Sequence, residues 1–418
     1  MNPFFIGTEN FTNSKKNYNI KKRAFENSGI KEIDKNMWEF LSLNPECFGL
    51  DISESSLKIA KLKKKERKSI KNLVSFGEMK LPLGIIEKGE IKNEDKLAQI
   101  IKKAISKVKG ERLKTKYVVA SLPEERAFLQ VIQLPLLEEE ELKVAVKYEA
   151  EHYIPLSLEE VYLDYEIIPP LYGKLNHLDV LISALPKEIV DSYVSTLEKA
   201  DLIPKALEIE SQAIARALIK NGVSPFPVLL IDLGASRTRF IIFSGYSLRF
   251  TTSISLSSQT FTKAISESLK IDEGEAEKLK IKYGVSGIKR VRLKKGEDVF
   301  FQREIIEEKK IFEILTPLLN ELAEEIKKYI NYYVTHSSHE HLPSNEKNIK
   351  KIILSGGGAL LKGIEKFLFS KLKIPVELGN PWTNILSFPL KEIPKISFEE
   401  SLRYTCAFGL ALRESEKL

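Results

Sequence analysis

One short pattern occurs twice in the chain and limits the possible folds more than any other feature. In residues 228–243 an apolar run ends in Asp232, a turn of small residues follows at 234–236, and a second apolar strand completes a hairpin. Residues 47–62 repeat this order, with Asp51 before a turn of hydroxylated residues. Because a supersecondary unit that recurs within one chain is typical of a duplication, we expect two related halves.

A tight hairpin with an acid at its entrance can hold a phosphate group. The backbone N–H groups and hydroxyls of the turn face the anion, and the carboxylate holds a hydrated Mg²⁺ beside it. The alternative is an ordinary core hairpin, in which the Asp and Ser side chains only shape the turn. The hairpin alone does not decide between the two.

A glycine-rich turn near the C-terminus favours the phosphate-binding interpretation. The apolar segment Ile352–Leu354 runs into Gly356, Gly357 and Gly358, and helical spacing begins at about Ala359. Glycines let the backbone approach a ligand closely, and the N-terminus of a helix favours an anion. Together with the two hairpins, this turn predicts a nucleotide site.

Composition limits the class of protein. A chain of 418 residues with 43% hydrophobic and 29% charged residues is too long for one core, so we expect two or more lobes. The net charge of +7 is not accompanied by a base-stacking aromatic pattern, which argues against nucleic acid as a partner. Cys47 and Cys406 are expected to be buried thiols. No apolar run approaches the ~20 residues that span a bilayer and no signal peptide precedes the chain, so we expect a cytoplasmic protein.

We expect four regions along the chain. An α/β lobe I at 47–120 is completed by 206–227 and by a C-terminal helix at 396–418, and a flexible extension at 1–46 precedes it. An inserted subdomain with the order βαββα occupies 121–205. Lobe II covers 228–395, with variable loops near 286–310 and 336–348 and a long helix that begins near Pro317, with Thr316 as its N-cap.

A histidine-containing stretch lies in the second of these loops. His336, His339, Glu340 and His341 are residue types that bind metals, but they stand between turn formers on chain that we expect to be exposed. A metal site needs a rigid frame and supporting hydrogen bonds, so we favour a solvated loop here.

The arrangement of these motifs resembles the actin-like ATPases, whose two related α/β lobes close on Mg·ATP. The resemblance covers residues 47–412 and depends on IDLGAS (231–236) and ILSGGGALLKG (353–363). More narrowly, the chain resembles the PilM family of type IV pilus assembly proteins. That resemblance depends on ASLPEERAFLQVIQLP (120–135), YEAEHYIPLSLEEVYLDYEII (148–168) and YTCAFGLALR (404–413).

The resemblance implies an ATP site between the lobes. Asp51 and Asp232 would hold Mg²⁺ through waters, and Glu210 would lie near the metal or an attacking water as the candidate catalytic residue. The residues that would contact the nucleotide are Asp51, Ser55, Ser56, Lys58, Asp232, Gly234, Ala235, Ser236, Glu277, Lys280, Gly356, Gly357 and Gly358.

The first hairpin departs from the family pattern. Ser53 and Glu54 stand where the family has Gly followed by Ser or Thr. A carboxylate that faces phosphate repels it, so we expect at most slow ATP hydrolysis.

The resemblance also implies a protein partner. The inserted subdomain would bind the cytoplasmic tail of a PilN-like inner-membrane protein, in a groove lined by Val146, Ala150, Tyr153 and Ile154, unless these residues are only the core of the subdomain. Other pilus assembly proteins are further expected partners, the membrane is reached only through partners, and a homo-oligomer is possible in principle. The alternatives are a cell-division scaffold resembling FtsA and a kinase of the sugar or acetate type.

Overall fold

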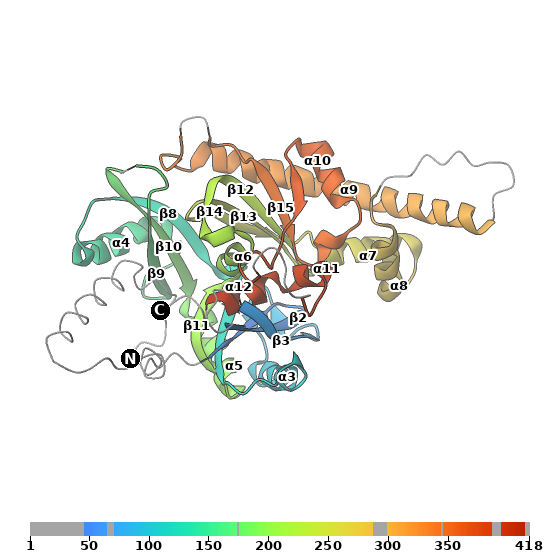
Figure 1. Cartoon of the computed structure of the whole chain (residues 1–418), viewed down its shortest axis with the longest axis horizontal. Coiled ribbons are helices and arrows are strands. Elements are labelled where there is room, and N and C mark those ends of the chain that lie inside the picture. The colour runs from blue at the N-terminus through green and yellow to red at the C-terminus, as the bar shows by residue number, and fades with distance from the viewer. Residues whose placement is uncertain are drawn as a thin grey trace.

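The structure is a computed structural model that describes residues 46–64, 71–173, 175–286, 299–343, 346–386 and 394–413. The expected extension at 1–46 lies outside these residues except for Glu46. The two lobes expected from the resemblance to the actin-like ATPases are present, each built on a mixed sheet with flanking helices (Figure 1).

Lobe I is built on a sheet with the strand order β11-β7-β1-β2-β3-β6. Its first three strands form an antiparallel meander, and β7 and then β11 add in parallel on the side of β1. The strands are β1 (Phe48–Ile52), β2 (Ser56–Lys64), β3 (Lys71–Lys80), β6 (Lys109–Gly110), β7 (Tyr117–Leu122) and β11 (Ile203–Ile209), and a short ribbon is formed by β4 (Ile86–Glu87) and β5 (Glu90–Ile91).

Lobe II repeats this topology with the strand order β14-β13-β12-β15-β16. Again three strands form an antiparallel meander, and two further strands add in parallel beside the first strand of that meander. The strands are β12 (Ser224–Leu233), β13 (Thr238–Gly245), β14 (Ser247–Ile254), β15 (Lys351–Ser355) and β16 (Val376–Leu378). The duplication that the two hairpins predict therefore extends to five strands of each sheet, and β6 of lobe I has no counterpart in lobe II.

Helices bury the apolar faces of both sheets. In lobe I, α3 (Glu94–Ser106) and α5 (Lys187–Lys199) share a core with β1 and β7. In lobe II, the corresponding core joins β12, β13 and β15 to α7 (Ser258–Leu269), α8 (Glu273–Tyr283), α9 (Val299–His336) and α10 (Ile364–Leu372). Short helical turns are η1 (Glu124–Arg126), η2 (Lys220–Gly222), η3 (Gly357–Leu360), α11 (Phe398–Ser401) and η4 (Leu402–Tyr404).

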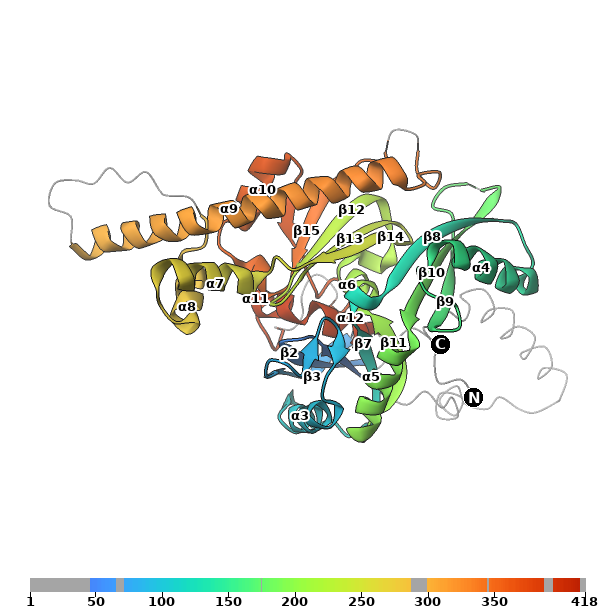
Figure 2. The same cartoon turned by 180° about the vertical axis from the view of Figure 1, so that it is seen from behind.

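Two helices cross between the lobes, as Figures 1 and 2 show. They are α6 (Glu210–Leu218), which follows the last strand of lobe I, and α12 (Thr405–Arg413), which follows lobe II. A Cβ on Gly409 would lie 1.8 Å from the carbonyl oxygen of Ala213, so only glycine permits this crossing distance. Buried Glu208 connects the two crossing helices, because it pairs with Arg216 of α6 at 2.5 Å and with Arg413 of α12 at 3.1 Å.

The inserted subdomain is a separate small unit. Its sheet has the order β8-β10-β9, with β8 (Phe128–Pro135), β9 (Val161–Ile168) and β10 (His177–Pro186), and α4 (Glu139–Tyr153) packs on it. Helix α5 was expected to belong to this unit, but the side chain of Tyr193 and its neighbours lie in the core of lobe I. The insert is therefore βαββ and ends near Pro186.

Helix α9 begins earlier than the sequence predicts. Pro317 lies inside a helix of 38 residues that starts at Val299, so the part of the expected loop at 286–310 that is described is largely helical. A proline costs a helix interior about 3 kcal/mol. Ile311 and Leu315, on the N-terminal side of Pro317, are fully buried in the core of lobe II, and their burial explains why the helix continues through the proline. Within the described residues, no helix is both long enough and apolar enough to cross a membrane.

Candidate functional site

The tips of the two hairpins form the same turn. Ser53 donates its backbone N–H to the carbonyl of Ser56 at 3.1 Å, and Gly234 donates to the carbonyl of Arg237 at 3.0 Å. In each hairpin the donor stands two residues after the acid and the acceptor five residues after it. The amides of the two residues in between, which include Ser55 and Ser236, lie at the tip, where they can face an anion.

The two acids are also equivalent in register. Asp51 is paired across its hairpin with Lys58, and Asp232 with Arg239, seven residues later in each case. Both pairs are ionic: the Lys58 Nζ lies 3.7 Å from Asp51 Oδ2, and the Arg239 Nη1 lies 3.2 Å from Asp232 Oδ2. Ser355 donates to Asp232 Oδ1 at 3.0 Å. Each acid is thus held by a cation of its own hairpin.

Arg239 joins the second hairpin to lobe I. Its Nε and Nη2 donate to the two oxygens of Glu210, at 2.8 and 2.5 Å, and Glu210 is the first residue of the crossing helix α6. Burial raises the pKa of the Glu210 carboxyl to about 8, Arg239 acts in the opposite direction, and the charges of Asp51 and Glu125 raise it further. Glu210 is therefore a buried partner of Arg239.

The glycine turn packs against the end of β12. Gly356 has φ of +82° and ψ of 167°, and a Cβ there would lie 2.5 Å from the Leu233 carbonyl oxygen and 2.9 Å from Asp232 Oδ1. A Cβ on Gly358 would lie 2.5 Å from the Leu233 side chain, whereas Gly357 has ordinary contact distances. Two of the three glycines are thus required by the close approach of this turn to the second hairpin.

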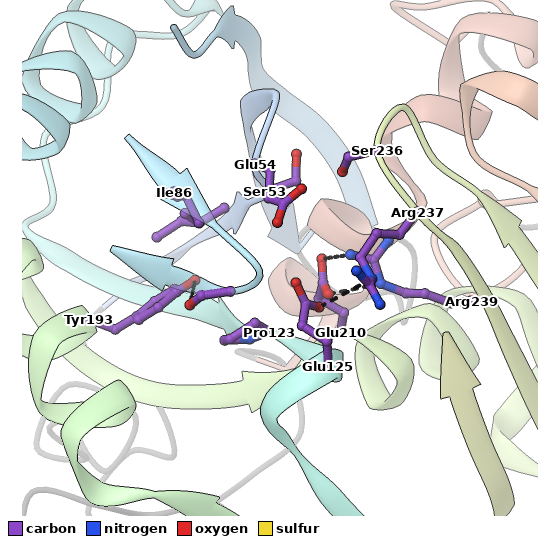
Figure 3. Close-up of a pocket in the computed structure, with 12 residues that line it drawn as sticks. Ser53, Glu54, Ile86, Pro123, Glu125, Tyr193, Glu210, Ser236, Arg237 and Arg239 are labelled. Atoms are coloured by element: carbon purple, nitrogen blue, oxygen red, sulfur yellow. Dashed lines mark hydrogen bonds and ion pairs between the residues drawn. The ribbon is translucent and has the colours of Figure 1, made fainter. Parts of the chain in front are cut away.

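A narrow opening lies between the hairpin tips (Figure 3). Ser53 and Glu54 line one side of it, Ser236 and Arg237 line the other, and Glu210, Glu125 and Arg239 lie at its base. This opening is much smaller than the ~300–1,000 Å³ that small-molecule sites typically have, so it does not hold a nucleotide in this structure. Asp51, Asp232 and the glycine turn lie outside its lining.

Glu54, the unexpected acid of the first turn, has a partner of its own. Its Oε1 accepts a hydrogen bond from the backbone N–H of Lys88 at 2.5 Å, so the carboxylate is bound to the β4–β5 turn. Ser56 is buried beneath it, and its hydroxyl accepts from Lys58 at 2.9 Å. Of the predicted hydroxyls in this turn, Ser55 and not Ser56 lies at the tip.

Glu277 and Lys280, which were predicted to contact the nucleotide, are partly occupied by protein partners. Lys280 is buried, and its Nζ donates to Ser258 and Thr262 of α7 and lies 2.7 Å from Glu277. The Glu277 side chain is 44% exposed, so it lies at the surface. Lys280 therefore positions Glu277 and α7, and Glu277 is the member of the pair that a ligand can reach.

Only one of the two acids predicted to hold magnesium, Asp51, has an oxygen without a protein partner. Mg²⁺ keeps several waters in near-octahedral geometry, and acidic side chains must accept hydrogen bonds from those waters. Asp51 Oδ1 is buried without a hydrogen-bond partner and suits that role. Both oxygens of Asp232 and both of Glu210 already accept hydrogen bonds from protein groups. No group of three or more His, Cys, Asp or Glu side chains that could hold a metal occurs in the described ranges.

The histidines of the loop after α9 have separate partners. His341 is buried, contrary to the expected exposed loop, and its Nε2 lies 3.0 Å from the Ser244 hydroxyl. Burial lowers its pKa to about 3, so it is neutral. His336 stacks on Tyr332, and His339 lies edge-on to a different ring.

Three of the four residues predicted to line the partner groove are core residues of the insert. Val146, Ala150 and Ile154 are buried in the core of the insert, because residues four apart share the face of α4 that packs on the sheet. Tyr153 is 47% exposed. The outer face of α4 instead presents Val144, 70% exposed, and Tyr148, 64% exposed.

Arg239 is the residue of the candidate site that the sequence did not predict. The signal that identifies it is the duplication itself: when the two hairpins are aligned on their acids, Arg239 falls on Lys58, which was predicted to contact the nucleotide. Glu124 was also missed, and its backbone N–H donates to Glu210 at 3.3 Å.

Comparisons with known proteins place these features in a family. The sequence pattern of the family described as "Type IV pilus assembly protein PilM" matches residues 49–287, more than half of the chain, and that of "Cell division protein FtsA" matches 229–395. FtsA of Enterococcus hirae is 27% identical over 215 residues, which is 48% of this chain and 46% of that protein. FtsA of Helicobacter pylori strain 26695 is 28% identical over 232 residues, 52% and 44% of the two chains. The matches therefore span less than half the length of these curated relatives.

A solved structure covers more of the chain. A structure described as the PilM–PilN type IV pilus biogenesis complex superimposes with a TM-score of 0.69 at 26% identity, covering 90% of this chain and 100% of that one.

Proposed function

The chain belongs to the PilM family of type IV pilus assembly proteins, and on that premise we propose that it is an ATP-binding assembly protein of the pilus inner-membrane complex. ATP binds between the lobes, and the inserted subdomain binds the cytoplasmic tail of a PilN-like membrane protein. The protein works on the cytoplasmic side of the membrane and is attached to it through such partners.

The observation that carries the nucleotide part of the proposal is the pair of equivalent turns. Both turns use the same hydrogen bond, from Ser53 to Ser56 and from Gly234 to Arg237, and they face one pocket from opposite lobes. Backbone amides at such tips bind phosphate oxygens without a conformational change in the side chains. The two turns bind the phosphates, and the nucleoside extends toward the glycine turn and Glu277.

The geometry supports binding more than turnover. A general base must be free to accept a proton from the attacking water. Glu210, the predicted catalytic residue, is bonded through both oxygens to Arg239. We therefore propose that ATP acts as a structural ligand that holds the lobes together, with hydrolysis at most slow.

The partner part of the proposal is supported by the outer face of α4. Val144 and Tyr148 form an exposed apolar patch one helical turn apart, and Glu141 and Glu151 are exposed on the same helix. Such a surface suits a short peptide with apolar anchors and basic residues. The similar solved complex contains PilN, which makes the tail of a PilN-like protein the first peptide to test.

Calorimetric titration tests both parts. ATP is titrated into the protein, and then a synthetic peptide of the PilN-like tail is titrated into the protein with and without ATP. We expect saturable binding of each ligand, and the absence of ATP binding at ~1 mM ligand, a free energy of about −4.1 kcal/mol, would refute the nucleotide site.

A second candidate function is a division scaffold that resembles FtsA. The FtsA pattern matches most of lobe II, and the curated relatives above carry that name. A peptide array with the tails of both pilus and division membrane proteins separates the candidates, because each function predicts binding to one set only.

A further inference from the structure

A positive side chain already lies between the acids of the candidate site. We propose, as an extension that rests on the nucleotide-binding function above, that Arg239 takes the place of the divalent cation, so that the protein binds a metal-free nucleoside triphosphate.

The contacts of Arg239 leave no place for a hydrated metal between the two acids. Its planar guanidinium makes two bonds to Glu210, at 2.8 and 2.5 Å, and one to Asp232, at 3.2 Å. Paired bonds of this kind fix the geometry as well as the charge. A magnesium ion with its water shell could enter here only after all three bonds broke.

The remaining oxygens of these acids are used as well. Asp232 Oδ1 accepts from Ser355 at 3.0 Å, and Glu210 Oε2 accepts from the backbone N–H of Glu124 at 3.3 Å. All four carboxylate oxygens therefore have protein donors. These bonds leave each acid fewer acceptor positions for the metal-bound waters through which a protein site holds Mg²⁺.

The carboxylates around Arg239 explain why a cation is needed at its position. Asp51, Glu125, Glu210 and Asp232 all act electrostatically on Arg239. Burial alone would lower its pKa, but these acids outweigh burial and keep it well above the ordinary value, so the guanidinium is charged at every pH at which the protein folds. Without Arg239 the cluster would need another cation or bound protons.

The first hairpin has the same arrangement. Lys58 stands at the register position of Arg239 and pairs with Asp51, 3.7 Å away. Lys58 also donates to Ser56 at the base of the turn. Each lobe thus supplies one cation beside its phosphate-binding turn, and together they match the double charge of one Mg²⁺.

Metal dependence of binding tests this inference. A fluorescent ATP analogue is titrated into the full chain in EDTA and in excess Mg²⁺. For the wild type we expect the two dissociation constants to agree within about twofold, a difference of ~0.4 kcal/mol. For Arg239→Ser, which frees both acids, we expect weaker binding in EDTA and a recovery of about tenfold or more with Mg²⁺.

Two further variants control for general effects. Arg239→Lys keeps the positive charge, so its ratio of affinities should stay near that of the wild type even if the serine variant fails to fold. Arg237→Ser removes an arginine from the same pocket that bonds to Ser253 at 3.2 Å and lies 4.0 Å from Glu125, but bonds to neither Glu210 nor Asp232, and its ratio should also be unchanged.

The outcomes separate this inference from the function on which it rests. Wild-type binding that needs Mg²⁺ by tenfold or more overturns the role of Arg239 but leaves nucleotide binding in place. A wild type that binds the analogue in neither buffer overturns both proposals.

Discussion

Replacing Gly356 with alanine tests whether the glycine turn positions the acid of the second hairpin. The backbone there has φ of +82° and ψ of 167°, a region almost restricted to glycine, which costs another residue about 1–3 kcal/mol. The added Cβ would lie 2.5 Å from the Leu233 carbonyl oxygen and 2.9 Å from Asp232 Oδ1, and overpacking of this kind costs a further 1–3 kcal/mol or so. We expect a total loss of about 2–6 kcal/mol in the free energy of unfolding.

The neighbouring glycine provides a matched control. A Cβ on Gly357 would meet nothing closer than the Arg403 side chain at 3.6 Å, and the residue lies in the short helical turn η3. Gly357→Ala should therefore be neutral or stabilise by about 0.4–1 kcal/mol, through the reduced entropy of the unfolded chain.

Scanning calorimetry and ATP titration measure the two effects. For Gly356→Ala the transition of lobe II should fall by at least about 4 °C, since 1 kcal/mol corresponds to ~2–4 °C for a unit of this size. Displacement of Asp232 should also weaken ATP binding by about tenfold. Equal transition temperatures for the two alanine variants would refute the close approach of the turn to Asp232.

Three other perturbations test the crossing helices and the insert. Glu208→Gln leaves buried Arg413 and partly buried Arg216 without their carboxylate, so we expect a loss of about 3–5 kcal/mol in the free energy of unfolding, measured with urea at pH 7. Burial opposes the charged form of Glu208, but its arginine partners hold its pKa below the ordinary value. This stabilisation is therefore present above about pH 4.3 and is lost as the pH falls further, a dependence that the variant should lack. Gly409→Val should prevent the close approach to Ala213 and lower the yield of folded protein in gel filtration, whereas a normal yield and melting curve would show that the crossing can open without cost. Tyr148→Ala should weaken binding of the partner peptide by fivefold or so at unchanged stability. Val146→Ala should lower stability at unchanged affinity for the peptide. The reverse result in calorimetry would indicate that the peptide binds through the buried face of α4.

The sequence predicted the features that depend on local pattern. The hairpins at Asp51 and Asp232 and the turn at Gly356 are encoded by apolar runs, acids and glycines within about 15 residues of each other, and the structure has all three where they were expected. The element against which each helix packs was not predictable in the same way. Helical periodicity shows which face of α5 is apolar, but not that Tyr193 would pack in lobe I instead of in the insert.

The missed residue illustrates the same limit. Arg239 is the second residue of the apolar strand β13, where its charge has no local explanation. Its role emerges only when strand register pairs it with Asp232 and the fold brings Glu210 from another lobe within hydrogen-bonding distance. The start of α9 was missed for a related reason, since burial of Leu315 and its neighbours outweighs the local preference of Pro317 for a first turn.

Hydrogen exchange with and without ATP tests the central claim most directly, because it reports on backbone amides and needs no substitution. The account predicts that ATP slows exchange at both turns together, in peptides covering 53–56 and 234–237, and at the glycine turn 356–358, while strands 128–135 and 177–186 of the insert are unchanged. Protection of only one hairpin, or of neither hairpin at saturating ATP, would contradict a phosphate site shared between the two lobes.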